Sequence, residues 1–169
     1  NTNQMLMEFM GLQLSGSSFV NPGTPLREQL TREAAIQVAK NTKANGVDRP
    51  LYKILDEKAF VNGIVGLMSS GGSTNLMIHL VAMARAAGIV IDWQDFADIS
   101  AAVPLLARAY PNGKADVNQL HAAGGLNFLM GELLDNGYLN NDVNTITSDN
   151  LLDYIQEPFL NGDKLEWKA

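Results

Sequence analysis

The residues best placed to do chemistry form the run Ser-Ser-Gly-Gly-Ser-Thr-Asn at positions 69–75, which leads into an apolar stretch. Gly71 and Gly72 allow the backbone to approach another group closely, because glycine has no Cβ. Ser73 or Thr74 can cap a following helix by accepting a hydrogen bond from a free N–H group. The remaining N–H groups and the helix dipole favour an anion in front of the loop. The sequence therefore predicts an anion-binding turn at a helix start.

Two histidines and one arginine are the next candidates. His79 follows Asn75 by four residues, so the two side chains share one face of the predicted helix. His79 is either a polar member of a site or a core histidine satisfied by hydrogen bonds. His121 has the same two readings, as a site residue or as a helix-end residue. Arg27 is the cation best placed to hold an anion, and the alternative is an ordinary surface arginine.

The composition limits the classes of protein that this chain can represent. It has 169 residues, 46% of them hydrophobic and 18% charged, which suits one soluble domain with a real core. The formal net charge of -6 argues against nucleic acid as a partner. No apolar run is long enough to span a bilayer, and no signal peptide is visible, so no membrane association is expected. The chain has no cysteine, which excludes disulfides and thiolate ligands within it.

The apolar spacing predicts the elements that position these residues. A capping hydroxyl and a proline at Thr24 and Pro25 predict a helix that continues to Gly46. Asp56 is expected to cap a helix that ends at the Ser-Gly run, and the apolar helix after that run is expected to lie in the core. Asp92 begins another helix, with a capping box. The remaining predicted helices cover residues 3–14, two pieces within 116–137, and 151–155.

Short strands complete the predicted fold. Residues 88–91 and 143–147 have the pattern of strands, and residues 103–107 are compatible with an edge strand. The last residues are interpreted as a tail or connection. We therefore expect a helix-rich α/β fold, part of a layered α/β domain, with a small and mostly parallel sheet. From these patterns alone, a non-enzymatic helical binding module remains as acceptable as an enzyme.

Three motifs carry a resemblance to a known family. They are Gly-Gly-Ser-Thr-Asn at 71–75 with the following helix and His79, Val-Pro-Leu-Leu-Ala at 103–107 leading to Pro-Asn-Gly-Lys at 111–114, and Leu-His-Ala-Ala-Gly-Gly at 120–125. In this order and spacing they resemble the dihydroxy-acid dehydratase / 6-phosphogluconate dehydratase family, over essentially the whole chain. Residues 3–12 and 19–27 resemble the branch that acts on 6-phosphogluconate.

The resemblance implies a function. Enzymes of this branch remove water from 6-phospho-D-gluconate to give 2-dehydro-3-deoxy-6-phosphogluconate, a step of the Entner–Doudoroff pathway in the bacterial cytoplasm. The family implies an iron–sulfur cluster bound by cysteines, a divalent metal such as Mg²⁺ held by carboxylates, a serine base in the C-terminal part, and a homodimer. A dihydroxy-acid or sugar-acid dehydratase of the same family is the alternative.

The sequence departs from the family in two respects. Family enzymes are several times longer, and this chain has no cysteine to hold the cluster. Residues 1–169 are therefore expected to be a single internal segment of the N-terminal domain, without catalytic or metal-binding residues, with no cofactor bound to it alone, and inactive by itself. Residues 1–3 resemble those that follow a cluster-binding cysteine. Within the segment, we expect Ser73, Thr74, Asn75 and His79 to line the active-site cleft, and Arg27 to meet the substrate phosphate.

Overall fold

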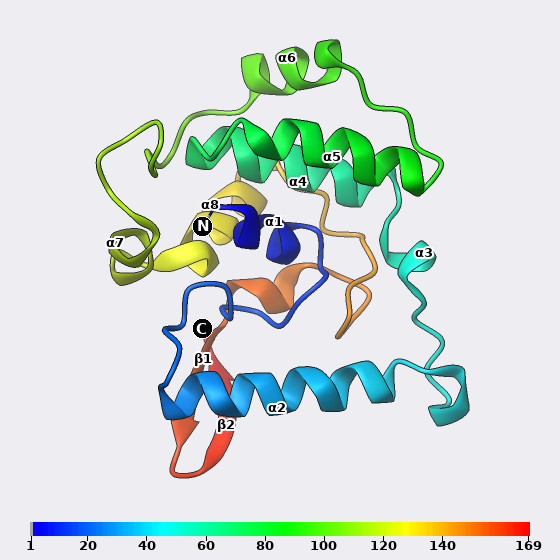
Figure 1. Ribbon diagram of the computed structural model, residues 1–169, viewed down its shortest axis with the longest axis vertical. Coiled ribbons are helices and arrows are strands. Elements are labelled where there is room, and N and C mark those ends of the chain that lie inside the picture. Colours follow the sequence, from blue (N-terminus) through cyan, green and yellow to red (C-terminus); the bar gives the residue numbers. More distant parts are fainter. Residues whose placement is uncertain (1) are drawn as a thin grey trace.

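The computed structural model describes residues 2–169, so Asn1, expected to follow a cluster-binding segment, lies outside the described residues. The chain is built mostly from helices, as expected (Figure 1). The helices are α1 (Asn3–Phe9), α2 (Pro25–Lys40), α3 (Leu51–Ile54), α4 (Glu57–Ser70), α5 (Asn75–Ala86), α6 (Trp93–Ala102), α7 (Val117–Ala122) and α8 (Gly125–Asp135), with short 3-10 helices η1 (Lys43–Asn45) and η2 (Leu152–Ile155).

The sheet differs from the prediction. It consists of two antiparallel strands, β1 (Glu157–Asn161) and β2 (Lys164–Lys168), so the prediction of a mostly parallel sheet is wrong. The predicted strands at 88–91, 103–107 and 143–147 have no partner strand among the described residues and are irregular. An apolar, alternating pattern forms a strand only where another strand is in reach, and that depends on the tertiary fold.

The helix starts follow the capping signals. Thr24 Oγ1 accepts from the Arg27 N–H, with Pro25 in the first turn. Asp56 accepts from the Ala59 N–H at the start of α4. Asp92 forms the predicted capping box at the start of α6. These three predictions are confirmed because a cap is formed by residues within one turn of each other.

Helix α2 ends earlier than predicted. Its last residue is Lys40, and a 3-10 turn follows before Gly46, which has a positive φ of 78°. The side-chain amides of Gln37 and Asn41 both donate to the carbonyl oxygen of Ile146, at 2.6 and 2.8 Å. These contacts tie the end of α2 to a segment more than a hundred residues away in sequence.

Helix α1 lies between two ends of the molecule. At one end α4 contacts both α5 and α6, and at the other α2 contacts β1 and β2 (Figure 1). Phe9 of α1 is fully buried, and a Cβ built on Gly66 of α4 would lie 2.5 Å from its ring. Gly63 is similarly close to Leu6 and Met10. The two glycines therefore let α1 and α4 pack closely.

Helix α5 is not buried in the core, contrary to the prediction. Leu76, Leu80 and Ala84 face inward, whereas Ile78 is 62% exposed. The apolar composition of α5 therefore exceeds what its contacts within this chain require. No helix within residues 2–169 combines the length and the apolar character that a membrane crossing needs.

Candidate functional site

The candidate site is built on the glycine loop, defined here as residues 71–75, which joins α4 to α5. Gly71 ends α4 in the left-handed conformation, with φ 61° and ψ 35°, which glycine adopts without strain. The Gly71 N–H donates to the Leu67 carbonyl and closes the last turn of the helix. The chain then turns sharply and starts α5 only four residues later.

A distant segment completes the end of α4. We call residues 105–112 the capping segment. The N–H groups of Leu106 and Ala107 both donate to the Ser69 carbonyl at 2.9 Å, and the Ala109 N–H donates to the Ser70 carbonyl at 3.0 Å. The final carbonyls of a helix have no partner inside the helix, so they need donors from elsewhere. The capping segment supplies these donors.

Ser73 caps the start of α5, whereas Thr74 does not. Ser73 Oγ accepts from the Asn75 N–H at 3.3 Å, and Thr74 forms no side-chain cap. The N–H of Ser73 itself donates to Thr2 Oγ1 at 3.1 Å, so the start of α1 braces the loop. The N–H groups of Leu76 and of the next residue donate to carbonyls of the loop.

These bonds bear on the predicted anion-binding turn. Most N–H groups of the loop already have partners inside the chain. An anion in front of α5 would have to displace some of these partners. The anion-binding turn therefore stays a prediction, and the rest of the protein would have to supply part of the positive charge.

A cavity of about 350 Å³ opens beside the glycine loop. None of its lining side chains is charged, so the cavity favours neutral hydrogen-bonding groups and apolar contacts. The residues that line it are Leu67, Met68, Gly71, Gly72, Thr74, Met77, Ser100, Val103, Leu105 and Asn112.

Asn75 and His79 share an exposed face of α5, as their spacing predicts. Because His79 is exposed, the reading as a core histidine is wrong, and its membership of a site stays a prediction. His121 is half-buried on α7. Ser73 is half-buried, Thr74 is exposed like Asn75 and His79, and of these four residues only Thr74 lines the cavity. Their side chains can donate and accept hydrogen bonds.

Arg27 lies elsewhere, in the first turn of α2. Its Nε donates to the Val20 carbonyl at 2.9 Å, and its Nη2 donates to the Ser17 carbonyl at 2.6 Å. These bonds hold the loop between α1 and α2. Figure 1 shows α2 at the opposite end of the molecule from α5. The fold therefore does not bring Arg27 together with the glycine loop.

Asn112 is a residue of this site that the sequence reasoning missed. Its side-chain amide donates to the Gly71 carbonyl at 2.8 Å and to the Gly72 carbonyl at 3.4 Å, and the residue lines the cavity. The Asn-Gly pair at 112–113 indicates a turn, but nothing local in the sequence indicates what that turn contacts.

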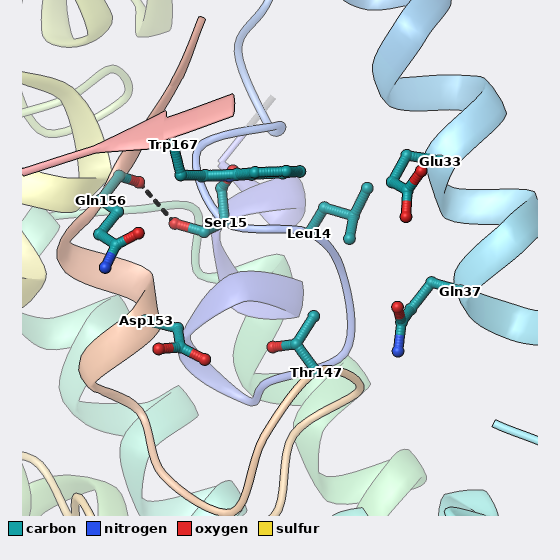
Figure 2. A pocket seen from close by; sticks show the side chains of 8 residues that line it. All are labelled: Leu14, Ser15, Glu33, Gln37, Thr147, Asp153, Gln156 and Trp167. Carbon is teal, nitrogen blue, oxygen red and sulfur yellow. Dashed lines mark hydrogen bonds between the residues drawn. The ribbon is translucent and has the colours of Figure 1, made fainter. Parts of the chain in front are cut away.

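A second pocket, of about 310 Å³, lies between α2 and β2 (Figure 2). Trp167 covers one side of it and donates from Nε1 to the Ser15 carbonyl at 3.1 Å. The carboxylates of Glu33 and Asp153 line it, which disfavours a phosphorylated or carboxylated ligand. The full lining is Leu14, Ser15, Glu33, Gln37, Thr147, Asp153, Gln156 and Trp167. Of these two hollows, only the cavity at the glycine loop has no charged side chain in its lining.

Within residues 2–169, no group of three or more His, Cys, Asp or Glu side chains is arranged to hold a metal ion. The sequence also supplies no cysteine thiolate. The donor set for an iron–sulfur cluster, or for a carboxylate-bound divalent metal, is thus not found in this part of the chain.

Comparison with known proteins gives the family that the motifs indicate. The family described as "Dihydroxy-acid/6-phosphogluconate dehydratase N-terminal" matches residues 1–154. Phosphogluconate dehydratase of Pseudomonas aeruginosa is 54% identical over 168 residues, which is 99% of this chain and 28% of that protein. The Escherichia coli K12 protein of the same name is 56% identical with the same coverage.

A more distant relative carries the other activity of the family. Dihydroxy-acid dehydratase of Oceanobacillus iheyensis is 36% identical over 157 residues, which is 93% of this chain and 28% of that protein. The chain thus spans 28% of the length of these curated relatives.

Proposed function

This chain belongs to the dihydroxy-acid/6-phosphogluconate dehydratase family, and we propose on that premise that it forms part of an enzyme that removes water from 6-phospho-D-gluconate. The product is 2-dehydro-3-deoxy-6-phosphogluconate. One observation carries the choice of substrate. Identity is 54% and 56% to the two phosphogluconate dehydratases named above, against 36% to the dihydroxy-acid dehydratase. These names favour an enzyme over a non-enzymatic binding module.

The role of this segment in the enzyme is to form one wall of the substrate cleft. Ser73, Thr74, Asn75 and His79 supply hydrogen-bonding groups along that wall. Two observations support this role: Thr74 lines the cavity beside the loop, and Asn75 and His79 are exposed on the same face of α5. Such groups suit the hydroxyls of a sugar acid.

The cofactors of the family do not fit the residues of this segment, because residues 2–169 hold no cluster of metal-binding side chains and the sequence has no cysteine. We propose that an iron–sulfur cluster and a divalent metal such as Mg²⁺ are held by other parts of the longer protein. The single segment 1–169 then belongs to its N-terminal domain and binds no cofactor alone. The family resemblance also supports the proposal that the longer protein is a homodimer and lies in the cytoplasm.

Arg27 is proposed as a contact for the substrate phosphate that is an alternative to the wall at the glycine loop, because α2 lies at the opposite end of the molecule from α5. Its guanidinium contacts only neutral carbonyls, and it forms no ion pair within residues 2–169, so its positive charge is not neutralised. A second role is structural, because the same contacts hold the loop before α2.

Kinetics of the full-length enzyme test the proposal. We expect turnover of 6-phosphogluconate, little turnover of a branched-chain dihydroxy acid, and none by residues 1–169 alone with iron and sulfide added. Dehydration of another sugar acid in preference to 6-phosphogluconate would contradict the substrate. Turnover by the isolated segment would contradict its proposed dependence on the rest of the protein.

Substitutions then assign the residues. Thr74→Ala is expected to raise KM, whereas Thr31→Ala, a threonine exposed on α2, serves as the matched control. Unchanged kinetics in Thr74→Ala would remove Thr74 from the cleft. Arg27→Ala separates two roles: a raised KM at unchanged melting temperature supports phosphate binding, and a lower melting temperature with unchanged KM supports the structural role alone.

A further inference from the structure

The glycine loop is shaped by hydrogen bonds to carbonyl groups at the end of α4. Four successive carbonyls, from Ser69 to Gly72, point out of the helix end and each accepts a bond from the capping segment. Backbone N–H groups serve the first two of them. The last two, which belong to Gly71 and Gly72 and so to the loop itself, are served by one side chain. That side chain is Asn112.

The chemistry of Asn112 allows only one orientation. An amide NH₂ group has two protons to donate, whereas the amide oxygen can only accept. Two carbonyl oxygens, at 2.8 and 3.4 Å, therefore require the NH₂ group to face the loop. The isosteric aspartate carboxylate has no proton to give at neutral pH and would repel both carbonyl oxygens.

The turn that carries Asn112 is itself tightly specified. The N–H groups of Asn112 and Gly113 both donate to the Ala109 carbonyl, and the Tyr110 N–H donates to the Ala115 carbonyl. A Cβ built on Gly113 would lie 1.8 Å from the Arg108 carbonyl oxygen, so only glycine fits there. The position of the Asn112 side chain is therefore set by the backbone of its own turn.

We propose that Asn112 is a positioning residue for substrate binding: its amide fixes the carbonyls of Gly71 and Gly72, and so sets the place of Ser73 and Thr74 in the cleft wall. The part of this proposal that concerns substrate binding rests on the proposed function. The part that concerns the position of the loop does not. Because Asn112 also lines the cavity, a change in KM alone does not separate a lost direct contact from a displaced loop, so the exchange of the loop is measured as well.

The test compares variants of the full-length enzyme. Asn112→Asp keeps the shape and removes the donors, and Asn112→Ala removes the whole amide. Asn136→Asp is the matched control, because Asn136 also precedes a glycine and its amide also donates to a helix carbonyl, that of Glu132 at 2.8 Å. Asn136 follows α8 and does not line the cavity.

Two readouts are needed. In Asn112→Asp, KM for 6-phosphogluconate is expected to rise by about tenfold or more, with a smaller change in kcat. Hydrogen exchange of peptides covering residues 69–76 is expected to accelerate by about tenfold at pH 7. Asn112→Ala should show both effects to a lesser degree. Asn136→Asp should show neither, even if its melting temperature falls.

The outcomes separate the two proposals. Unchanged exchange and unchanged KM in both Asn112 variants would overturn the positioning role. Faster exchange with an unchanged KM would confirm that Asn112 holds the loop but remove the loop from the substrate cleft. If the wild-type enzyme does not dehydrate 6-phosphogluconate, the proposed function fails, and the exchange measurement still decides whether Asn112 positions the loop. A variant that does not fold is replaced by the other one.

Discussion

At the scale of single residues, the clearest feature is Glu8, whose carboxylate is fully buried. One of its oxygens accepts from the Gly16 N–H at 2.7 Å and the other from the Ser18 N–H at 2.8 Å. Gln13 adds a longer bond at 3.4 Å. Burial raises the pKa of Glu8, and these hydrogen bonds partly oppose that rise. Glu8 thus holds the loop after α1 by hydrogen bonds, although burial disfavours its charged form.

The raised pKa of Glu8 predicts a dependence of stability on pH. The folded state binds the proton more tightly than the unfolded state, whose pKa is near 4.5. The contribution of the protonated Glu8 side chain to the stability of the folded state is therefore fully present below pH 4.5 and is lost as the pH rises through the folded pKa. Glu8→Gln removes this titration but leaves an amide NH₂ facing a backbone N–H, so we expect it to be less stable.

The comparison of the two proteins checks this prediction. The difference in free energy of unfolding between wild type and Glu8→Gln should be largest below pH 4.5 and should narrow as the pH rises toward 7. Urea denaturation at several pH values measures it. A difference that widens with rising pH would show that the ionised carboxylate is the form favoured by folding.

At the residue scale, the sequence predicted contacts within a turn and missed those between distant segments. Asn75 and His79 share a face because helical spacing is local. A cap from Ser73 or Thr74 is predictable for the same reason, and the structure shows that Ser73 provides it. The bond from Ser73 to Thr2 spans 71 residues, and the bond from Asn112 to Gly71 spans 41. No local pattern encodes such pairs, so the bracing of the loop could not be predicted.

At the scale of elements, helices were predicted well because their caps and apolar spacing are local. Strands were not. The segment at 88–91 has an apolar pattern but no partner, and Val90 is 81% exposed. The hairpin β1–β2 was missed, although Gly162-Asp163, the two residues between the strands, is a recognised hairpin signal. The apolar character of α5 predicts burial of the whole helix, whereas only one face of that helix packs inside this chain.

The close contact of α1 with α4 predicts that a glycine substitution there has the opposite effect to a glycine substitution in an open part of another helix. Gly66→Ala puts a methyl group 2.5 Å from the ring of Phe9, which is fully buried. Overpacking costs about 1–3 kcal/mol, which the better helix propensity of alanine, about 1 kcal/mol, only partly offsets. We expect a net loss of stability, measured by urea denaturation.

Gly131→Ala is the matched control for this prediction. Gly131 is also inside a helix, α8, but the nearest atom to its built Cβ is a methyl carbon of Ile155 at 3.8 Å. This substitution should stabilise the protein by about 0.5–1 kcal/mol. A stabilising Gly66→Ala would show that α1 and α4 are not held at close contact in solution.

At the scale of the whole molecule, the largest of the hollows described here is an apolar groove of about 650 Å³ beside α3 and the end of α5. Leu51, on its edge, is 60% exposed. A groove of this kind takes up apolar molecules from water. The residues that line it are Met7, Leu12, Leu51, Tyr52, Leu55, Met83, Ala86, Ala87 and Ile146.

The groove predicts binding of a hydrophobic fluorescent dye to the 169-residue chain. We expect dye fluorescence to increase on binding, and Leu51→Lys to abolish most of that increase. Val90→Lys is the control, because Val90 is exposed but does not line the groove. Equal loss of fluorescence in both variants would indicate diffuse binding over the apolar surface. The dye titration should be repeated at several protein concentrations, so that self-association is detected.

The hydrogen bonds between the capping segment and α4 also set an order of events during protein synthesis. The ribosome completes the Gly-Gly turn long before it reaches Asn112, which lies 41 residues later than Gly71. At translation rates of 5–20 residues per second, that interval is roughly 2–8 s. For that time the nascent chain carries the loop without the side chain that holds it. The final shape of the loop is therefore acquired late, after its own sequence has left the site of peptide-bond formation.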